Sequence, residues 1–247
     1  MISTFLFDFN GTLMRSPAWI ALEVRDLPRA AFAHLASEGH VPLLSEEQLA
    51  QAERVFHNQR AAAEGQYVET SHLDDLAAMV GELGLGAQVP PALVEETVAT
   101  LHRRCLPTVE LMPHIQDTLK RLREMGLRLG IISNAAYPPF LSWTLAHFGI
   151  LDYFEEVVVS ADVRTRKPGL DIFEIALERM GLETGKTAYV GDDFRKDVAA
   201  SQQVGLRAVW FNPDDKAPPP GIDATADAVV RDHDEIPPLA TQWLAEG

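Results

Sequence analysis

The stretch FLFDFNGTL, residues 5–13, decides the fold of this chain. It belongs to a short apolar and aromatic run, Ile2–Phe9, which predicts a buried β-strand that Gly11 ends in a turn. Asp8 therefore stands where the strand ends. Because ligands of parallel α/β sheets bind beyond the carboxyl ends of the strands, Asp8 is the first candidate for a functional residue.

After Pro107 the sequence alternates between short apolar segments and helical patterns. Strands are predicted at Leu127–Ser133, Val157–Ser160, Thr187–Val190 and Leu206–Phe211, and helices at Pro113–Met125, Phe140–Phe148, Leu170–Met180 and Arg195–Val204. Since the connections are short, the alternation indicates a doubly wound, Rossmann-like parallel sheet with helices on both faces. The proline-rich stretch Pro213–Gly221 is typical of a surface loop.

The residues between the first strand and this region have a different composition. From about Pro17 to Cys105 the chain is rich in Ala, Leu, Glu and Gln, and prolines and glycines divide it into four or five helix-sized pieces without a strand. We therefore predict an α/β core of residues 1–14 and 106–247, interrupted by an α-helical cap of residues 15–105.

The composition argues against several partners and sites. The chain has 247 residues, 21 Lys+Arg and 36 Asp+Glu, so its net charge of −15 disfavours nucleic acid and anionic membranes as partners. No signal peptide and no membrane-spanning apolar run is visible, which favours a cytoplasmic protein. The single cysteine, Cys105, excludes a cysteine-rich zinc site. No two of the 8 histidines are three or four residues apart, so a histidine-based metal site is not expected.

Polar residues follow the predicted strands, or face the same end of the sheet. They are Asp8, Ser133, Asn134, Lys167, Asp192, Asp193 and, one turn into the next helix, Asp197. Several carboxylates that converge on one crevice repel each other unless a cation joins them. Oxygen-only ligands suit Mg²⁺, which takes one or two carboxylates and keeps several waters.

These elements resemble, in order, the motifs of the haloacid dehalogenase-like hydrolase superfamily. The matching stretches are Asp8–Thr12, Ile131–Asn134, Arg166–Pro168, and Gly191–Asp193 together with Asp197. The helical insert resembles the C1-type cap of that superfamily's phosphatase-like members. The resemblance covers nearly the whole chain and implies hydrolysis of a small phosphorylated molecule.

The resemblance also implies roles for individual residues. Asp8 is expected to be the nucleophile that forms an aspartyl-phosphate, with Lys167 neutralising the charge that Asp8 and the phosphoryl group share. Magnesium would be bound by Asp8, Asp192 and the backbone carbonyl of Asn10. The remaining motif residues divide into a substrate-binding set, Ser133, Asn134 and Thr12, and a set that supports the metal ligands or orients the lysine, Asp193 and Asp197.

One catalytic position departs from the pattern. The superfamily's phosphatases read Asp-x-Asp-Gly-Thr, and the second Asp is their general acid and base, whereas this chain has Asn10. An amide donates a hydrogen bond but transfers no proton at neutral pH. The expected loss is roughly 10²–10⁴-fold in rate, or about 3–5.5 kcal/mol of barrier.

Four explanations of Asn10 stay open at this point. The protein is a phosphatase that uses water or another side chain as its acid, or it carries an introduced substitution. Alternatively, it is a 2-haloacid dehalogenase-like hydrolase, whose reaction needs no acid, or a non-catalytic protein that binds a phosphorylated ligand. The sequence argues against the phosphonate-cleaving relatives, because they need a cap lysine and all lysines here follow residue 105.

The cap is expected to contribute side chains to the pocket. Its hinges are predicted near Met14–Pro17 and Leu106–Pro113. The candidates that could reach the site are Arg15, Trp19, His57, Asn58 and Arg60.

Overall fold

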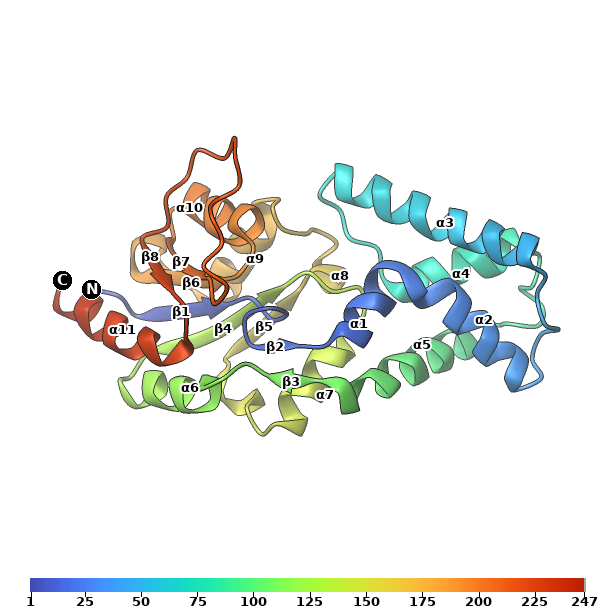
Figure 1. Ribbon diagram of the computed structural model, residues 1–247, viewed down its shortest axis with the longest axis horizontal. Helices are drawn as coiled ribbons and strands as arrows, with labels where there is room; N and C mark the ends of the chain where they lie inside the picture. The colour runs from blue at the N-terminus through green and yellow to red at the C-terminus, as the bar shows by residue number, and fades with distance from the viewer. Residues whose placement is uncertain (247) are drawn as a thin grey trace.

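A six-stranded parallel sheet forms the centre of the core in the computed structural model, which describes residues 1–246 (Figure 1). The strand order is β5-β4-β1-β6-β7-β8. The strands are β1 (Thr4–Phe7), β4 (Arg128–Ser133), β5 (Glu156–Val159), β6 (Thr187–Gly191), β7 (Arg207–Phe211) and β8 (Ala228–Val230). Because the chain builds outward from β1 first on one side and then on the other, the doubly wound Rossmann-like fold is confirmed.

Strand β1 lies in the middle of the sheet and is buried on both faces. Phe5 and Phe7 pack into the cluster on one face, while Leu6, between them, packs into the cluster on the other. This alternation follows from the two-residue period of a β-strand. It explains why the sequence here is continuously apolar rather than alternating.

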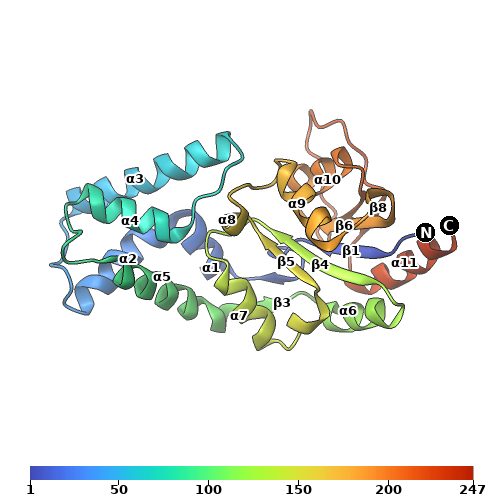
Figure 2. The ribbon, with the colours of Figure 1, turned by 180° about the vertical axis from the view of Figure 1, so that it is seen from behind.

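Helices cover both faces of the sheet (Figure 2). On one face lie α9 (Asp171–Met180), α10 (Ala200–Gln203) and the π-helical segment Phe194–Ala199, and on the other lie α6 (Ile115–Glu124) and α11 (Ile236–Ala245). Two further helices, α7 (Pro139–His147) and α8 (Ser160–Val163), follow β4 and β5. These positions confirm the predicted alternation of strand and helix.

The segment between β1 and α6 forms a helical bundle beyond one end of the sheet (Figure 1). It contains α1 (Pro17–Ala21), the π-helical segment Leu22–Asp26, α2 (Leu27–Ser37), α3 (Glu46–Gly65), α4 (His72–Glu82) and α5 (Pro91–Cys105). A short antiparallel pair, β2 (Met14–Arg15) and β3 (Glu110–Leu111), joins the chain where it enters and leaves the bundle. The two predicted hinges therefore lie side by side.

Two C-terminal elements, β8 and α11, lie outside the predicted set. Strand β8 has only 3 residues, too few to show a period, and α11 begins with Ile236 followed by two prolines. The prolines occupy the first turn, where a helix tolerates them, but they hide the helical pattern. Among residues 1–246, no helix is both long and apolar enough to cross a membrane.

Candidate active site

Lys167 is the centre of the charged group at the carboxyl ends of the strands. Its Nζ donates hydrogen bonds of 2.7 Å to Asp8 Oδ1, Asp197 Oδ1 and Tyr189 Oη, and the residue is only 2% exposed. Burial alone would lower the pKa of Lys167, but the charges of Asp197 and Asp8 outweigh it and raise the pKa above its ordinary value. The lysine is therefore a fixed cation beside the Asp8 carboxylate.

Asn134 fixes the backbone that carries this lysine. Its Nδ2 donates to the Lys167 carbonyl at 2.8 Å, and its Oδ1 accepts the Lys167 N–H at 2.9 Å. Both polar atoms of the amide thus hold Lys167 in place, and Asn134 also lines the pocket. Ser133 lines the pocket, as the predicted substrate contact requires, whereas Thr12 is fully buried with a hydroxyl that has no partner within residues 1–246.

Two glycines allow the acidic residues to approach the strand ends. Gly11 has φ +86°, and a Cβ on it would lie 2.5 Å from Asp192 Oδ2. A Cβ on Gly191 would lie 2.4 Å from the Cβ of Asp197. Only residues without a side chain fit at both positions, so the glycines of the two motifs serve the geometry of the carboxylates.

Three buried or partly buried carboxylates lie at this edge with one lysine between them. One oxygen each from Asp8, Asp192 and Asp197 lies within 4.8 Å of the others. Burial, together with the negative charges of Asp8 and Asp197, raises the pKa of Asp192 to about 7. Both oxygens of Asp197 are occupied, by Lys167 and by the Asp193 N–H at 2.9 Å. Asp8 and Asp192 are therefore the pair whose repulsion an oxygen-preferring divalent cation would relieve.

Asp193 points to its own helix. Its Oδ1 accepts the backbone N–H groups of Arg195 and Lys196 at 3.0 and 2.8 Å, and its Oδ2 forms an ion pair with Lys196. Burial alone would raise the pKa of Asp193, but the backbone N–H and the charge of Lys196 outweigh it and lower the pKa. Asp193 thus caps the π-helical segment that carries Asp197, which supports the site from outside.

Asn10 faces the pocket with an unpaired oxygen. Its side chain lines the same cavity as Asp8, and its Oδ1 is buried without a hydrogen-bond partner among the described residues. A buried amide oxygen without a partner is uncommon in proteins. The position is therefore available for a group that enters the pocket.

The strand ends and the bundle together enclose a pocket of about 230 Å³. The bundle side contributes Trp19, Ile20, Glu23, Val24, Arg60 and Glu69. Two of the predicted cap candidates, Trp19 and Arg60, therefore reach the pocket, whereas Arg15 lines a neighbouring one. Glu69, which the sequence did not single out, accepts a 2.8 Å hydrogen bond from Arg60 and is 1% exposed.

His233 holds the loop that follows β1, and no sequence signal marked it. It is fully buried, its Nε2 donates to the Thr12 carbonyl at 2.6 Å, and its ring stacks on Phe211 with centroids 4.2 Å apart. A carbonyl only accepts, so the proton lies on Nε2 and Nδ1 keeps its lone pair. The contact joins residues 221 apart in the chain, which explains why local patterns did not reveal it.

This buried histidine makes the fold sensitive to acid. Burial lowers the pKa of His233 to about 4, below the ordinary value of 6.5, so the unfolded chain binds the proton more readily. The stabilisation is complete above pH 6.5 and is lost as the pH falls towards 4, by about 2 kcal/mol between pH 7.5 and 5.0. In urea unfolding at these two pH values, His233→Gln is expected to remove this difference of about 2 kcal/mol from the change in the free energy of unfolding. The exposed His147→Gln serves as control, and an unchanged slope in His233→Gln would contradict the assignment.

The inference from histidine spacing was wrong in one respect. His72 and His102 are 30 residues apart, yet their Nδ1 and Nε2 atoms lie 2.9 Å from each other. The packing of α4 against α5 brings them together, and spacing along the chain reports only pairs within one helix.

Comparison with known proteins identifies the family of this chain. The model of a haloacid dehalogenase-like hydrolase family matches residues 2–205. The glyceraldehyde 3-phosphate phosphatases of Methanocaldococcus jannaschii and Methanopyrus kandleri are 28% and 31% identical over 210 residues, which is 85% of this chain and 84% and 83% of theirs. A 2-haloacid dehalogenase structure from Pseudomonas syringae superposes with a TM-score of 0.75 at 23% identity, covering 98% of this chain and 100% of that one, and shows the fold. The chain therefore belongs to the haloacid dehalogenase-like hydrolases and is an enzyme of the hydrolase class.

Proposed function

We propose that this protein is a magnesium-dependent phosphatase that acts on a small phosphate ester. The observation that carries the proposal is the buried Lys167, held at 2.7 Å from Asp8 beside the carboxylate of Asp192. Phosphoryl transfer needs positioning and charge neutralisation above all, and this group supplies both. The names of the two archaeal relatives, both phosphatases of a three-carbon phosphate, support the same substrate class.

In the proposed reaction a carboxylate oxygen of Asp8 attacks the phosphorus, and the P–O bond to the ester oxygen breaks. The leaving group departs as its oxyanion, which takes a proton from water because Asn10 supplies none. Water then attacks the phosphorus of the aspartyl-phosphate, which releases inorganic phosphate and restores the Asp8 carboxylate. Lys167 offsets the negative charge beside the phosphoryl group, and the Ser133 hydroxyl, which lines the pocket, donates a hydrogen bond to a phosphoryl oxygen. Tyr189 and Asp197 keep the lysine aimed at Asp8.

Magnesium fits the donors at this edge. Asp8 and Asp192 supply carboxylate oxygens, and the backbone carbonyl of Asn10 is proposed as a third ligand. The ion supplies charge neutralisation for the attacking and phosphoryl oxygens. The protein residues bind and orient these groups. Gly11 leaves room for the Asp192 side chain, and Asp197 binds the Lys167 ammonium group.

Residues 15–105 are proposed to act as a cap on a core of residues 1–14 and 106–247. Trp19 and Arg60 from the bundle line the same pocket as Asp8, which supports a role in choosing the substrate. The paired strands β2 and β3 give the bundle a two-stranded connection about which it can move.

The leaving group provides the direct test of this function. Without an acid at position 10, an aryl phosphate, whose leaving oxygen needs no proton, is expected to be hydrolysed roughly 10²–10⁴-fold faster than an alkyl phosphate. Phosphate release from p-nitrophenyl phosphate, glyceraldehyde 3-phosphate and glycerol phosphate would be measured with Mg²⁺ and with chelator. Loss of activity in chelator supports the proposal.

A second candidate, the 2-haloacid dehalogenase-like reaction, is favoured by one observation, the neutral Asn10. Displacement of a halide needs no acid, so Asn10 would cost that reaction nothing. Release of chloride from 2-chloropropionate that persists in chelator, without phosphate release from any ester, would replace the phosphatase by this candidate. Ligand affinity without either product would instead indicate a binding protein.

A further inference from the structure

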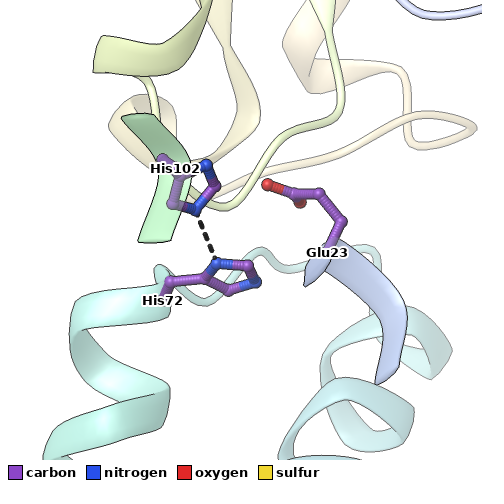
Figure 3. A group of neighbouring side chains, drawn as sticks. All are labelled: Glu23, His72 and His102. Atoms are coloured by element: carbon purple, nitrogen blue, oxygen red, sulfur yellow. Dashed lines mark hydrogen bonds between the residues drawn. The ribbon is translucent and has the colours of Figure 1, made fainter. Parts of the chain in front are cut away.

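A second group of metal-binding side chains lies between the bundle and the loop that follows β4. Glu23 comes from the π-helical segment after α1, His72 is the first residue of α4, and His102 lies in α5 (Figure 3). One donor atom from each residue lies within 4.8 Å of the others. The three residues are 5%, 0% and 0% exposed. In Figure 3 the two imidazoles face each other and the carboxylate points towards them.

The hydrogen bonds within residues 1–246 leave this group incomplete. Glu23 Oε1, His72 Nε2 and His102 Nδ1 are all buried without a partner. Only one proton can lie between the facing nitrogens of the two rings, which are 2.9 Å apart. The two unpaired ring nitrogens are the outer ones, so the atom that indicates a missing binding partner is the unpaired Glu23 Oε1, beside two facing nitrogens that share one proton.

The surroundings hold these side chains in place. The second oxygen of Glu23 accepts the Ala136 N–H at 2.9 Å, and the backbone N–H of His72 donates to the Ala136 carbonyl at 2.9 Å. The ring of His102 stacks on Tyr137 with centroids 4.5 Å apart. Such contacts around the ligands are what orient the side chains of a metal site.

We propose that Glu23, His72 and His102 form a site for a zinc-type transition-metal ion. Two imidazoles and one carboxylate are donors that zinc prefers, whereas magnesium prefers oxygen alone. Two tetrahedral ligands 2.0–2.1 Å from one ion are roughly 3.3–3.4 Å apart. The facing ring nitrogens, 2.9 Å apart, therefore need to separate by only about 0.5 Å to bind one ion. The Glu23 carboxylate points towards the two rings, and one of its oxygens lies within 4.8 Å of a nitrogen of each.

Two further observations support the site. Burial lowers the pKa of both His72 and His102, so both rings are neutral at pH 7, the form that binds a metal. Glu23 also lines the active-site pocket, which gives an ion a path from solvent and a water for its fourth position. The ion would join three segments of the bundle, two of which also hydrogen-bond to Ala136 in the loop that follows β4.

The test counts zinc ions on the folded enzyme. Protein stripped with chelator is given millimolar Mg²⁺, which occupies the site at Asp8, and then zinc, and is passed through gel filtration for elemental analysis. The background is His114→Gln, because His114 forms an exposed group with Asp232 and Asp234 that also offers zinc ligands. We expect one zinc per chain, and none after the further change His102→Gln or His72→Gln. Zinc is also expected to raise the unfolding temperature by about 5–10 °C at 100 times its Kd.

Two outcomes overturn the proposal. Less than about a tenth of a zinc ion per chain in the His114→Gln background means that the two rings form a hydrogen-bonded pair only. Zinc that stays bound in the double variants is bound at a different site, which also contradicts the proposal. If those variants fail to fold by circular dichroism, Co²⁺ replaces zinc in the folded background protein. The visible absorption of imidazole-bound Co²⁺ then decides, and its absence rejects the site.

Discussion

Asp8→Asn is expected to abolish phosphate release, with a fall in kcat of roughly 10⁴–10⁶-fold, while the protein stays folded. An amide has no carboxylate oxygen to attack phosphorus, but its oxygen still accepts the hydrogen bond from Lys167 Nζ. The substitution also removes one of three negative charges, which relieves the repulsion that raises the pKa of Asp192. We therefore expect the unfolding temperature to stay within about 3 °C of the unmodified protein in chelator.

The matched control for this prediction is Asp117→Asn, the same change on an exposed position of α6. It should leave both kcat and the unfolding temperature unchanged. Residual activity of Asp8→Asn above about 1% of the unmodified protein would mean that another group attacks the substrate, and Asp8 would then lose its role as nucleophile. A large drop in unfolding temperature would instead show that the ion pair with Lys167 stabilises the fold more than the repulsion destabilises it.

The polar residues that the sequence singled out lie together at one edge of the sheet because they stand where strands end. Asp8 and Asp192 each follow an apolar strand and Ser133 ends one, and the carboxyl ends of parallel strands meet at one edge of a sheet. Lys167 was expected at the same end of the sheet, and its role came from the resemblance. The structure adds what holds it there, since Asn134 binds its backbone. The strand pattern and the topology of the sheet were therefore enough to predict that these residues lie at one edge.

The residues that prediction missed are joined by contacts between distant segments. Tyr189 lies within β6, where its apolar neighbours hide the hydroxyl that binds Lys167. His233 binds the loop after β1, which is 221 residues away in the sequence. His72 contacts His102 only because α4 packs on α5. No single-sequence pattern reports such packing, since periodicity describes one element at a time.

Asn10→Asp is expected to raise the turnover of alkyl phosphates by roughly 10²–10⁴-fold and to change aryl phosphates little. Asp has nearly the shape of Asn, so the loop at Gly11 and the hydrogen bond of His233 to Thr12 should persist. The new carboxyl would enter a pocket that already holds Asp8 and Asp192, and their negative charges would raise its pKa towards neutrality. A carboxyl with such a pKa can give a proton to the leaving oxygen and later accept one from water.

The control compares the two leaving groups rather than two residues. If Asn10 limits the rate only through the missing proton, the ratio of aryl to alkyl turnover should collapse in Asn10→Asp, while Asn10→Ser, which also transfers no proton, should keep it. A fourth carboxylate also adds repulsion, so Asn10→Asp should lower the unfolding temperature in chelator and recover it in Mg²⁺. An unchanged alkyl rate in a folded, magnesium-binding Asn10→Asp protein would show that position 10 does not limit turnover. The acid would then have to be sought among the other pocket residues, for example Glu23 in the zinc-free protein, whose pKa burial raises to about 7.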